Sequence, residues 1–224
     1  GGRAWRELHK LAEGWASDGD AAAGVMLGRI RVDPVGVLGR ARGDADQTPR
    51  RLGEGVVVLD PAGVHFVQRE GPAAAGAASA AIYEWVGLTA AGQFPERVKA
   101  QVRKEGDVCL HRYGPRHTVI HCAAHDFRAD SRNPTQRLAQ AYARVLSQFA
   151  WAVQTSGATE LRLLPLSGGL FAGRYKQEVV PLTLQSLHGA FKLLRPADRA
   201  LLCKAAVEIR LCVYDEQQAG QFVR

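Results

Sequence analysis

The sequence predicts an α/β fold in which a mixed or mostly parallel sheet lies between helices. Two observations carry this prediction. Apolar runs of strand length alternate along the chain with segments of helical periodicity. Several of the strand-like runs are continuously apolar, which is typical of strands that are buried on both faces.

The first part of the chain has weaker signals. Residues 4–16 place Trp5 and Trp15 on one stripe of an expected amphipathic helix, and the apolar pieces 24–32 and 35–42 indicate weak strands or connectors. Beyond residue 54 the elements are clearer. We expect strands within 55–63, 107–114, 117–125, 160–166 and 207–216, and helices within 73–87, 95–104, 133–157, 177–194 and 196–206.

Composition limits the class of protein. The chain has 224 residues, of which 46% are hydrophobic and 23% charged, as in ordinary globular domains. No run of about 18 apolar residues exists, so no membrane span is expected. The four cysteines form no CxxC pair, which predicts reduced thiols, no metal site and an intracellular protein, cytoplasmic or mitochondrial.

The net charge of +7 is concentrated in one region. Residues 97–144 hold ten Lys and Arg against four Asp and Glu. Such a region suits an acidic protein or RNA, and its alternative interpretation is a solvated basic face. We expect the helix over 95–104 to present its basic side chains together: Arg97, Lys99, Arg103 and Lys104.

Loops of small residues follow two predicted strands. Asp60-Pro61-Ala62-Gly63 ends one strand, Ser167-Gly168-Gly169 ends another, and the segment 70–79 leads into a helix. Ligands of open α/β sheets bind at the carboxyl ends of strands, and bare backbone N–H groups at a helix start can hold a phosphate. The sequence therefore predicts a phosphate-binding edge, although neither GxGxxG nor GxxxxGK[ST] is present.

The order of these pieces resembles the macrodomain family. Four segments carry the resemblance: VVVLDPAG, GPAAAGAASAAIYEWVG, TVIHCAAHDF and LRLLPLSGGLFAG, followed by a closing strand that ends in LCVYDE. The resemblance implies a three-layer α/β/α domain over 51–224 that binds ADP-ribose or a related nucleotide, with residues 1–50 as an N-terminal extension. No cofactor is implied beyond this ligand.

Position by position, the resemblance implies two diphosphate loops. Gly71, Ala75 and Gly76 would line the first loop. Ser167, Gly168, Gly169, Leu170 and Phe171 would form the second, with Phe171 near the distal ribose. Tyr214 would stack near the adenine, and Asp44 is the available candidate for an adenine-contacting carboxylate.

The two asparagines of the family pattern are replaced in this chain. Asp60 and Gly63 occupy their positions, and Pro72 and Ala73 interrupt the glycine run. An ionised carboxylate only accepts hydrogen bonds, Gly63 offers no side chain, and Pro72 has no N–H. These changes argue against catalysis.

Three classes of function therefore remain open. The first is a binding module that holds ADP-ribose or a related nucleotide with little or no hydrolase activity. The second is a non-catalytic scaffold subunit of a larger assembly, ribonucleoprotein or organellar. The third is an ADP-ribosyl hydrolase. His117, His121 and His125 recur at every fourth residue, but Thr118-Val119-Ile120 indicates a strand, so a structural or surface role is expected.

Overall fold

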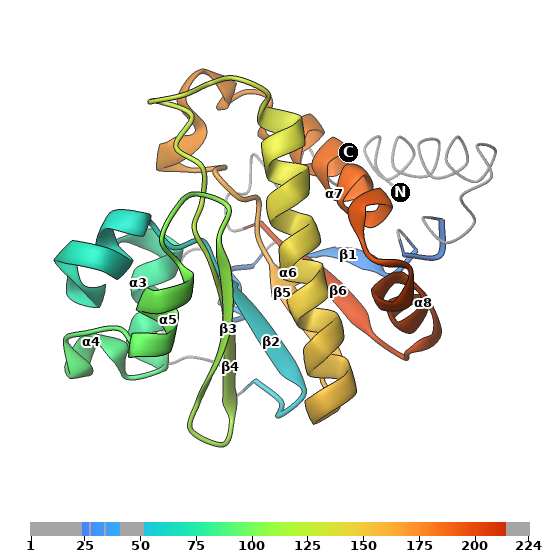
Figure 1. Ribbon diagram of the computed structural model, residues 1–224, viewed down its shortest axis with the longest axis horizontal. Helices are drawn as coiled ribbons and strands as arrows, with labels where there is room; N and C mark the ends of the chain where they lie inside the picture. The colour runs from blue at the N-terminus through green and yellow to red at the C-terminus, as the bar shows by residue number, and fades with distance from the viewer. Residues whose placement is uncertain (1–23, 27, 34, 41–51, 214–224) are drawn as a thin grey trace.

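A computed structural model describes residues 24–26, 28–33, 35–40 and 52–213 of the chain. They form a six-stranded sheet with helices on both faces (Figure 1). The strand order is β1-β6-β5-β2-β4-β3, and every neighbouring pair is parallel except β3 and β4. The predicted three-layer α/β/α fold with a mixed central sheet is confirmed.

The strands agree with the apolar runs of the sequence. Their bounds are Ile30–Asp33 (β1), Val56–Asp60 (β2), Val108–Tyr113 (β3), His117–Cys122 (β4), Glu160–Leu163 (β5) and Glu208–Cys212 (β6). β1 comes from the segment that we expected to be an extension, and it pairs in parallel with β6. The sheet therefore reaches into residues 1–50.

Two groups of helices cover the sheet. On one face lie α3 (Ala77–Trp85), α4 (Leu88–Ala91) and α5 (Glu96–Gln101), and on the other lie α6 (Pro134–Ser156), α7 (Val179–Leu193) and α8 (Pro196–Lys204) (Figure 1). No helix in the described part of the chain is both long enough and apolar enough to span a bilayer.

Strand β2 divides its side chains between the two cores. Val57 and Leu59 pack with the α6 and α7 side, whereas Val56 and Val58 pack with the α3 and α5 side. This alternation is the two-residue period of a strand. Asp60 follows Val56 and Val58 on the face toward α3 and α5, so a carboxylate lies where the pattern predicts an apolar residue.

Helix α6 forms as its sequence predicts. Pro134 begins it, because a proline in the first turn loses no intrahelical hydrogen bond. Gly157 ends it with a left-handed φ of 66°, a conformation that glycine adopts without steric strain. The predicted apolar stripe, including Tyr142 and Phe149, is buried.

The structure corrects two local expectations. Residues 73–76 are not part of α3, which begins at Ala77 after a 3₁₀ turn over Pro72–Ala74. The basic helix α5 also ends at Gln101. Arg103 and Lys104 lie beyond it, in a turn where their backbone N–H groups donate to the Asp107 carboxylate.

Three further expectations fall on residues that lie outside the described ranges. They are the helix over 4–16, the candidate Asp44 and the adenine-stacking candidate Tyr214.

We predict that Phe149→Ala lowers the free energy of unfolding by about 3–5 kcal/mol, because a fully buried aromatic ring leaves a cavity that the core only partly fills. Trp151→Ala, two residues away on the same helix, is the control, since Trp151 is 48% exposed. Chemical denaturation of both variants measures the difference. Equal losses would contradict the assignment of Phe149 to the core.

Candidate functional site

Three loops meet at the carboxyl ends of the neighbouring parallel strands β5, β2 and β4, above the sheet in Figure 1. Hydrogen bonds fasten them together. The N–H of Ala124 donates to the carbonyl of Ala62 at 2.9 Å, and the N–H of Phe127 donates to the carbonyl of Phe171 at 3.0 Å. The Ser167 hydroxyl donates to the carbonyl of His125 at 2.6 Å. The loop after β4 is therefore joined both to the Asp60–Gly63 turn and to the second predicted phosphate loop.

In the second loop, the surroundings of Ser167, Gly168 and Gly169 differ, and only some of them restrict the size of the side chain. Ser167 has a left-handed φ of 56° and is held by its bond to His125. A Cβ on Gly168 would lie 2.9 Å from both the carbonyl oxygen and the Cβ of Pro165, so packing requires glycine there. A Cβ on Gly169 would meet no atom within 4 Å. The fold explains Gly168 but leaves Gly169 open to solvent.

The first loop shows the same contrast. A Cβ on Gly63 would lie 2.9 Å from both the His65 and Phe66 rings. Gly71 has a φ of 82°, and a Cβ there would lie 3.2 Å from the carbonyl oxygen of Gly92. At Gly76, immediately before α3, the space is open.

Unused donors accompany these open glycines. Within the described residues, the N–H groups of Gly169 and Leu170 make no hydrogen bond, and Gly76 begins α3 with no side-chain cap. The first N–H groups of a helix carry partial positive charge and have no intrahelical acceptor. Ala75 lies half-buried beside Gly76. The edge thus presents bare donors from both loops.

Side chains complete the rim of the second loop. Leu170 is 77% exposed, and the half-buried Phe171 contacts the His65 ring edge-on at a centroid distance of 6.4 Å. The Arg128 guanidinium lies 5.2 Å from the centre of the Phe171 ring. It also binds the Asp126 carboxylate through two nitrogens and holds the pKa of that carboxyl below its usual range.

Asp60 lies beneath this edge, fully buried. The Ser79 hydroxyl donates to Oδ1 at 2.7 Å, and the Tyr83 hydroxyl donates to Oδ2 at 2.8 Å. Nδ1 of His121 lies 2.6 Å from Oδ2, and because a carboxylate only accepts, this nitrogen carries the proton. The carboxylate therefore bonds only to buried groups and is not exposed at the edge formed by the loops.

A second hydrogen bond continues the chain from His121. Its Nε2 lies 2.7 Å from the Tyr113 hydroxyl on the edge strand β3. Burial, and then the Asp60 charge, raise the pKa values of both Tyr83 and Tyr113 above their ordinary value. Both phenols therefore keep their protons. The Tyr83 hydroxyl bonds to the Asp60 carboxylate directly, and the Tyr113 hydroxyl is connected to it through His121.

Sequence reasoning assigned His121 no specific role, although a signal was present. His121 shares the buried face of β4 with Val119, as Asp60 shares that of β2 with Val58. A histidine and an aspartate on continuously apolar strands are expected to form a hydrogen bond, because burying a polar group without a partner costs free energy. Their pairing depends on the register that places Asp60 opposite His121.

Metal binding has little support in this part of the molecule. Among the described residues, no group of three or more His, Cys, Asp and Glu side chains is arranged to hold a metal ion. Cys109, Cys122 and Cys212 are buried, Cys203 is half-buried, and none forms a disulfide. Burial raises the pKa of the Cys122 thiol to about 12, so it remains protonated.

We predict that Asp60→Asn lowers the free energy of unfolding by about 3 kcal/mol, even though it restores the residue type of the family pattern. An amide has one acceptor oxygen, and its NH₂ group would face a donor. Chemical denaturation measures the loss. Asp130→Asn is the control, because Asp130 is only half-buried and pairs with Arg132 and Arg137 near the surface. A variant as stable as the parent protein would show that the carboxylate is not needed.

Comparisons with known proteins agree with this architecture. No family model and no curated protein matches the sequence. Among solved structures, a variant of the Oceanobacillus iheyensis macrodomain matches with a TM-score of 0.55 and 16% identity, covering 86% of this chain and 87% of that one. The Trypanosoma brucei macrodomain in complex with ADP matches with a TM-score of 0.54 and 14% identity, covering 88% and 69%.

A viral structure matches over a similar part of this chain. The alphavirus P23pro-zbd has a TM-score of 0.52 and 17% identity and covers 86% of this chain, but the chain spans only 22% of that protein. At these identities the likeness concerns the fold. The chain therefore has a divergent macrodomain-like fold, as its sequence motifs predicted.

Proposed function

We propose that this protein binds ADP-ribose or a related nucleoside diphosphate between its two small-residue loops, with little or no hydrolysis. The observation that carries the proposal is the pair of open glycines, Gly76 and Gly169, at the carboxyl ends of the neighbouring strands β2 and β5. No protein atom fills the space beside either residue, so the backbone there is open to a ligand that approaches closely.

The ligand class follows from the donors. The N–H groups of Gly169 and Leu170 and the start of α3 suit phosphate oxygens. Phe171 offers an aromatic face beside them, next to His65 and Arg128. Structures of similar fold hold such ligands: the T. brucei macrodomain has been solved with ADP-ribose and the O. iheyensis macrodomain with ADP. In the proposed complex Tyr214 stacks near the adenine.

The residues at the two asparagine positions, Asp60 and Gly63, favour ligand binding without hydrolysis. The Asp60 carboxylate is fully buried and accepts from three groups, so it is not free to activate water. Gly63 contributes no side chain at the second position of the family pattern. Neither position supplies the amide that the family uses.

We predict that ADP-ribose binds the parent protein and that Gly169→Val abolishes this binding while the fold is retained. The valine side chain enters space that is empty of protein atoms and covers the N–H groups. Calorimetric titration measures affinity, and circular dichroism measures the fold. Gly24→Val is the control, because Gly24 is also open and precedes β1 at the opposite edge of the sheet.

Two results would count against the proposal. One is the absence of binding to the folded parent protein. The other is unchanged affinity in Gly169→Val, which would place the ligand elsewhere.

A scaffold function has its own support in the distribution of charge. The four acidic residues within 97–144 all form ion pairs with partners inside that range, among them Glu105 with Arg137 and Asp107 with Arg144. Lys99 pairs with Glu96. Within the described residues, five cations near β3 have no acidic partner: Arg97, Arg103, Lys104, Arg112 and Arg116. This surplus suits an acidic protein or RNA.

For this second function, we predict that reversing Arg97, Arg103 and Lys104 to Glu removes partners that co-purify with the parent protein at low salt. Attraction between surface charges is screened over about 8 Å at physiological ionic strength, so rising salt should release the same partners. The control reverses Lys192, Arg195 and Lys204 on the opposite face. Identical partners and salt dependence in both variants would leave these cations as a solvated face.

A further inference from the structure

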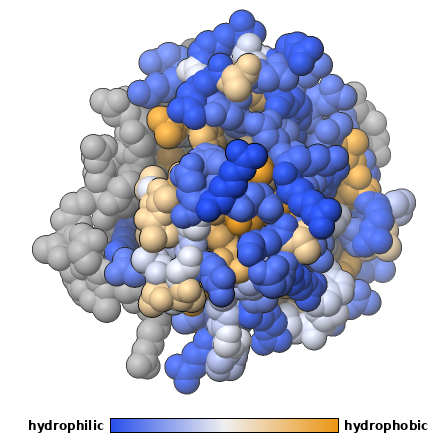
Figure 2. Space-filling view, turned by 60° about the vertical axis from the view of Figure 1, so that its left-hand side comes forward, coloured by the Kyte–Doolittle hydropathy of each residue, from blue (hydrophilic) through white to orange (hydrophobic). Residues whose placement is uncertain are grey.

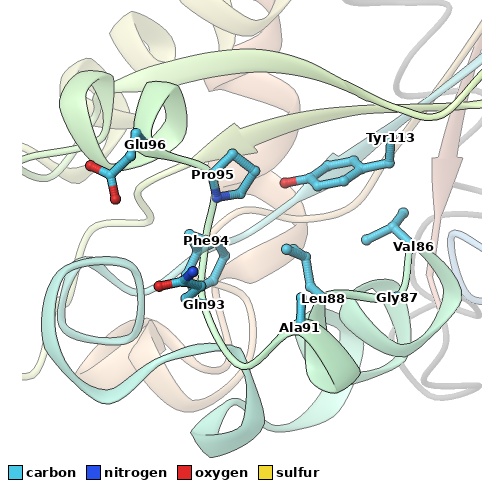
Figure 3. A pocket seen from close by; sticks show the side chains of 9 residues that line it. All are labelled: Val86, Gly87, Leu88, Ala91, Gln93, Phe94, Pro95, Glu96 and Tyr113. Carbon is cyan, nitrogen blue, oxygen red and sulfur yellow. The ribbon is translucent and has the colours of Figure 1, made fainter.

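A pocket of about 320 Å³ lies between α4, the start of α5 and the end of β3. Figure 2 shows this side of the molecule, where apolar residues lie at the base of a hollow between hydrophilic ones. Most of the wall is apolar, and the nine residues that line it are Val86, Gly87, Leu88, Ala91, Gln93, Phe94, Pro95, Glu96 and Tyr113 (Figure 3).

This pocket is separate from the loop edge. The first loop leads into the amino end of α3, whereas Val86 and Gly87 follow its carboxyl end. Nine helical residues span about 13 Å. None of the residues that line the pocket belongs to either small-residue loop.

Three polar side chains belong to the pocket wall, and two of them are at its rim. Gln93 and Glu96 are exposed, and Glu96 is already paired with Lys99 at 2.8 Å. The third is Tyr113, whose ring extends from β3 toward Phe94 and Pro95 above Leu88 (Figure 3). Tyr113 is half-buried, and its hydroxyl is the polar group that a ligand between these apolar walls would meet.

The buried chain behind the wall fixes the hydrogen-bonding character of this hydroxyl. With its proton on Nδ1, which donates to Asp60, the His121 ring presents Nε2 as an acceptor for the Tyr113 hydroxyl 2.7 Å away. The Phe94 ring packs edge-on against His121, at a centroid distance of 5.9 Å, and holds it in place. The Tyr113 oxygen thus keeps its lone pairs for a donor in the pocket.

We propose that this pocket is a second ligand site, which binds a single-ring aromatic molecule carrying one hydroxyl or N–H donor. Apolar and aromatic walls with one oriented polar group are typical of small-molecule sites, and this volume is at the lower end of their range. The paired Glu96 gives no preference for a cation. The donor is selected because Tyr113 presents an acceptor.

Phenol and anisole test this inference, since both are single rings and only phenol has a donor. ¹H–¹⁵N spectra of the labelled protein should show shifts within residues 86–96 and at Tyr113. Phenol should bind about fivefold more tightly than anisole, which is the contribution of one neutral hydrogen bond. Tyr113→Phe should remove this preference, because it keeps the ring and loses the acceptor.

Tyr142→Phe is the matched control. It also removes the hydroxyl of a buried tyrosine, but that hydroxyl donates to the carbonyl of Leu164 and Tyr142 does not line the pocket, so the preference for phenol should remain. Shifts outside this region, no shifts, or equal binding of the two probes to the parent protein would overturn the inference. The last comparison needs no variant and is independent of ADP-ribose binding.

Discussion

The buried carboxylate of Asp60 is the constraint on which the arrangement of this molecule depends. A carboxylate without exposed surface must be satisfied by donors, and here two elements provide three of them. Ser79 and Tyr83 come from α3 and His121 from β4. The carboxylate therefore fixes the amino end of α3 against the end of β2, which is where the first loop must hold its N–H groups.

The same constraint acts in the other direction. Through His121, the Asp60 carboxylate orients the Tyr113 hydroxyl on the edge strand. The loop edge and the pocket beside α4 are therefore built on one hydrogen-bonded chain. A residue that in sequence departs from the family pattern becomes, in the structure, an internal support for both regions.

The parts of the fold that could be predicted from sequence are those set by local pattern. The β-branched run before Asp60 determines a buried strand, and the stripe through Tyr142 and Phe149 determines α6. The order of motifs indicated the macrodomain-like architecture even though identity to the solved structures described above is only 14–17%.

What could not be predicted depends on contacts between distant residues. The π-helical and 3₁₀ turns over 66–74 meet at Gly71, whose φ of 82° and closeness to the Gly92 carbonyl no local propensity encodes. His121 is 61 residues from Asp60, and their pairing requires the sheet register. The difference between Gly168, where a Cβ would clash with Pro165, and Gly169, where it would meet no atom, also appears only when neighbouring atoms are known.

The surroundings of each glycine indicate which glycines the fold restricts and which lie beside open space, a distinction that the family resemblance does not make. Gly71 is required by its backbone angle and Gly168 by the Pro165 carbonyl beside it. At Gly76 and Gly169 no protein atom fills the adjacent space. This open backbone is the physical basis for proposing a binding protein.

The most direct test of this account is to follow the backbone N–H resonances of the labelled protein during titration with ADP-ribose. Ligand held by the two loops should shift the resonances of residues 75–79 and 167–171 together, with one saturation curve. Resonances near Gly24, at the opposite edge, should stay unchanged. If ADP-ribose leaves both loops unchanged while the protein is folded, the loops do not form a nucleotide site and the central claim is contradicted.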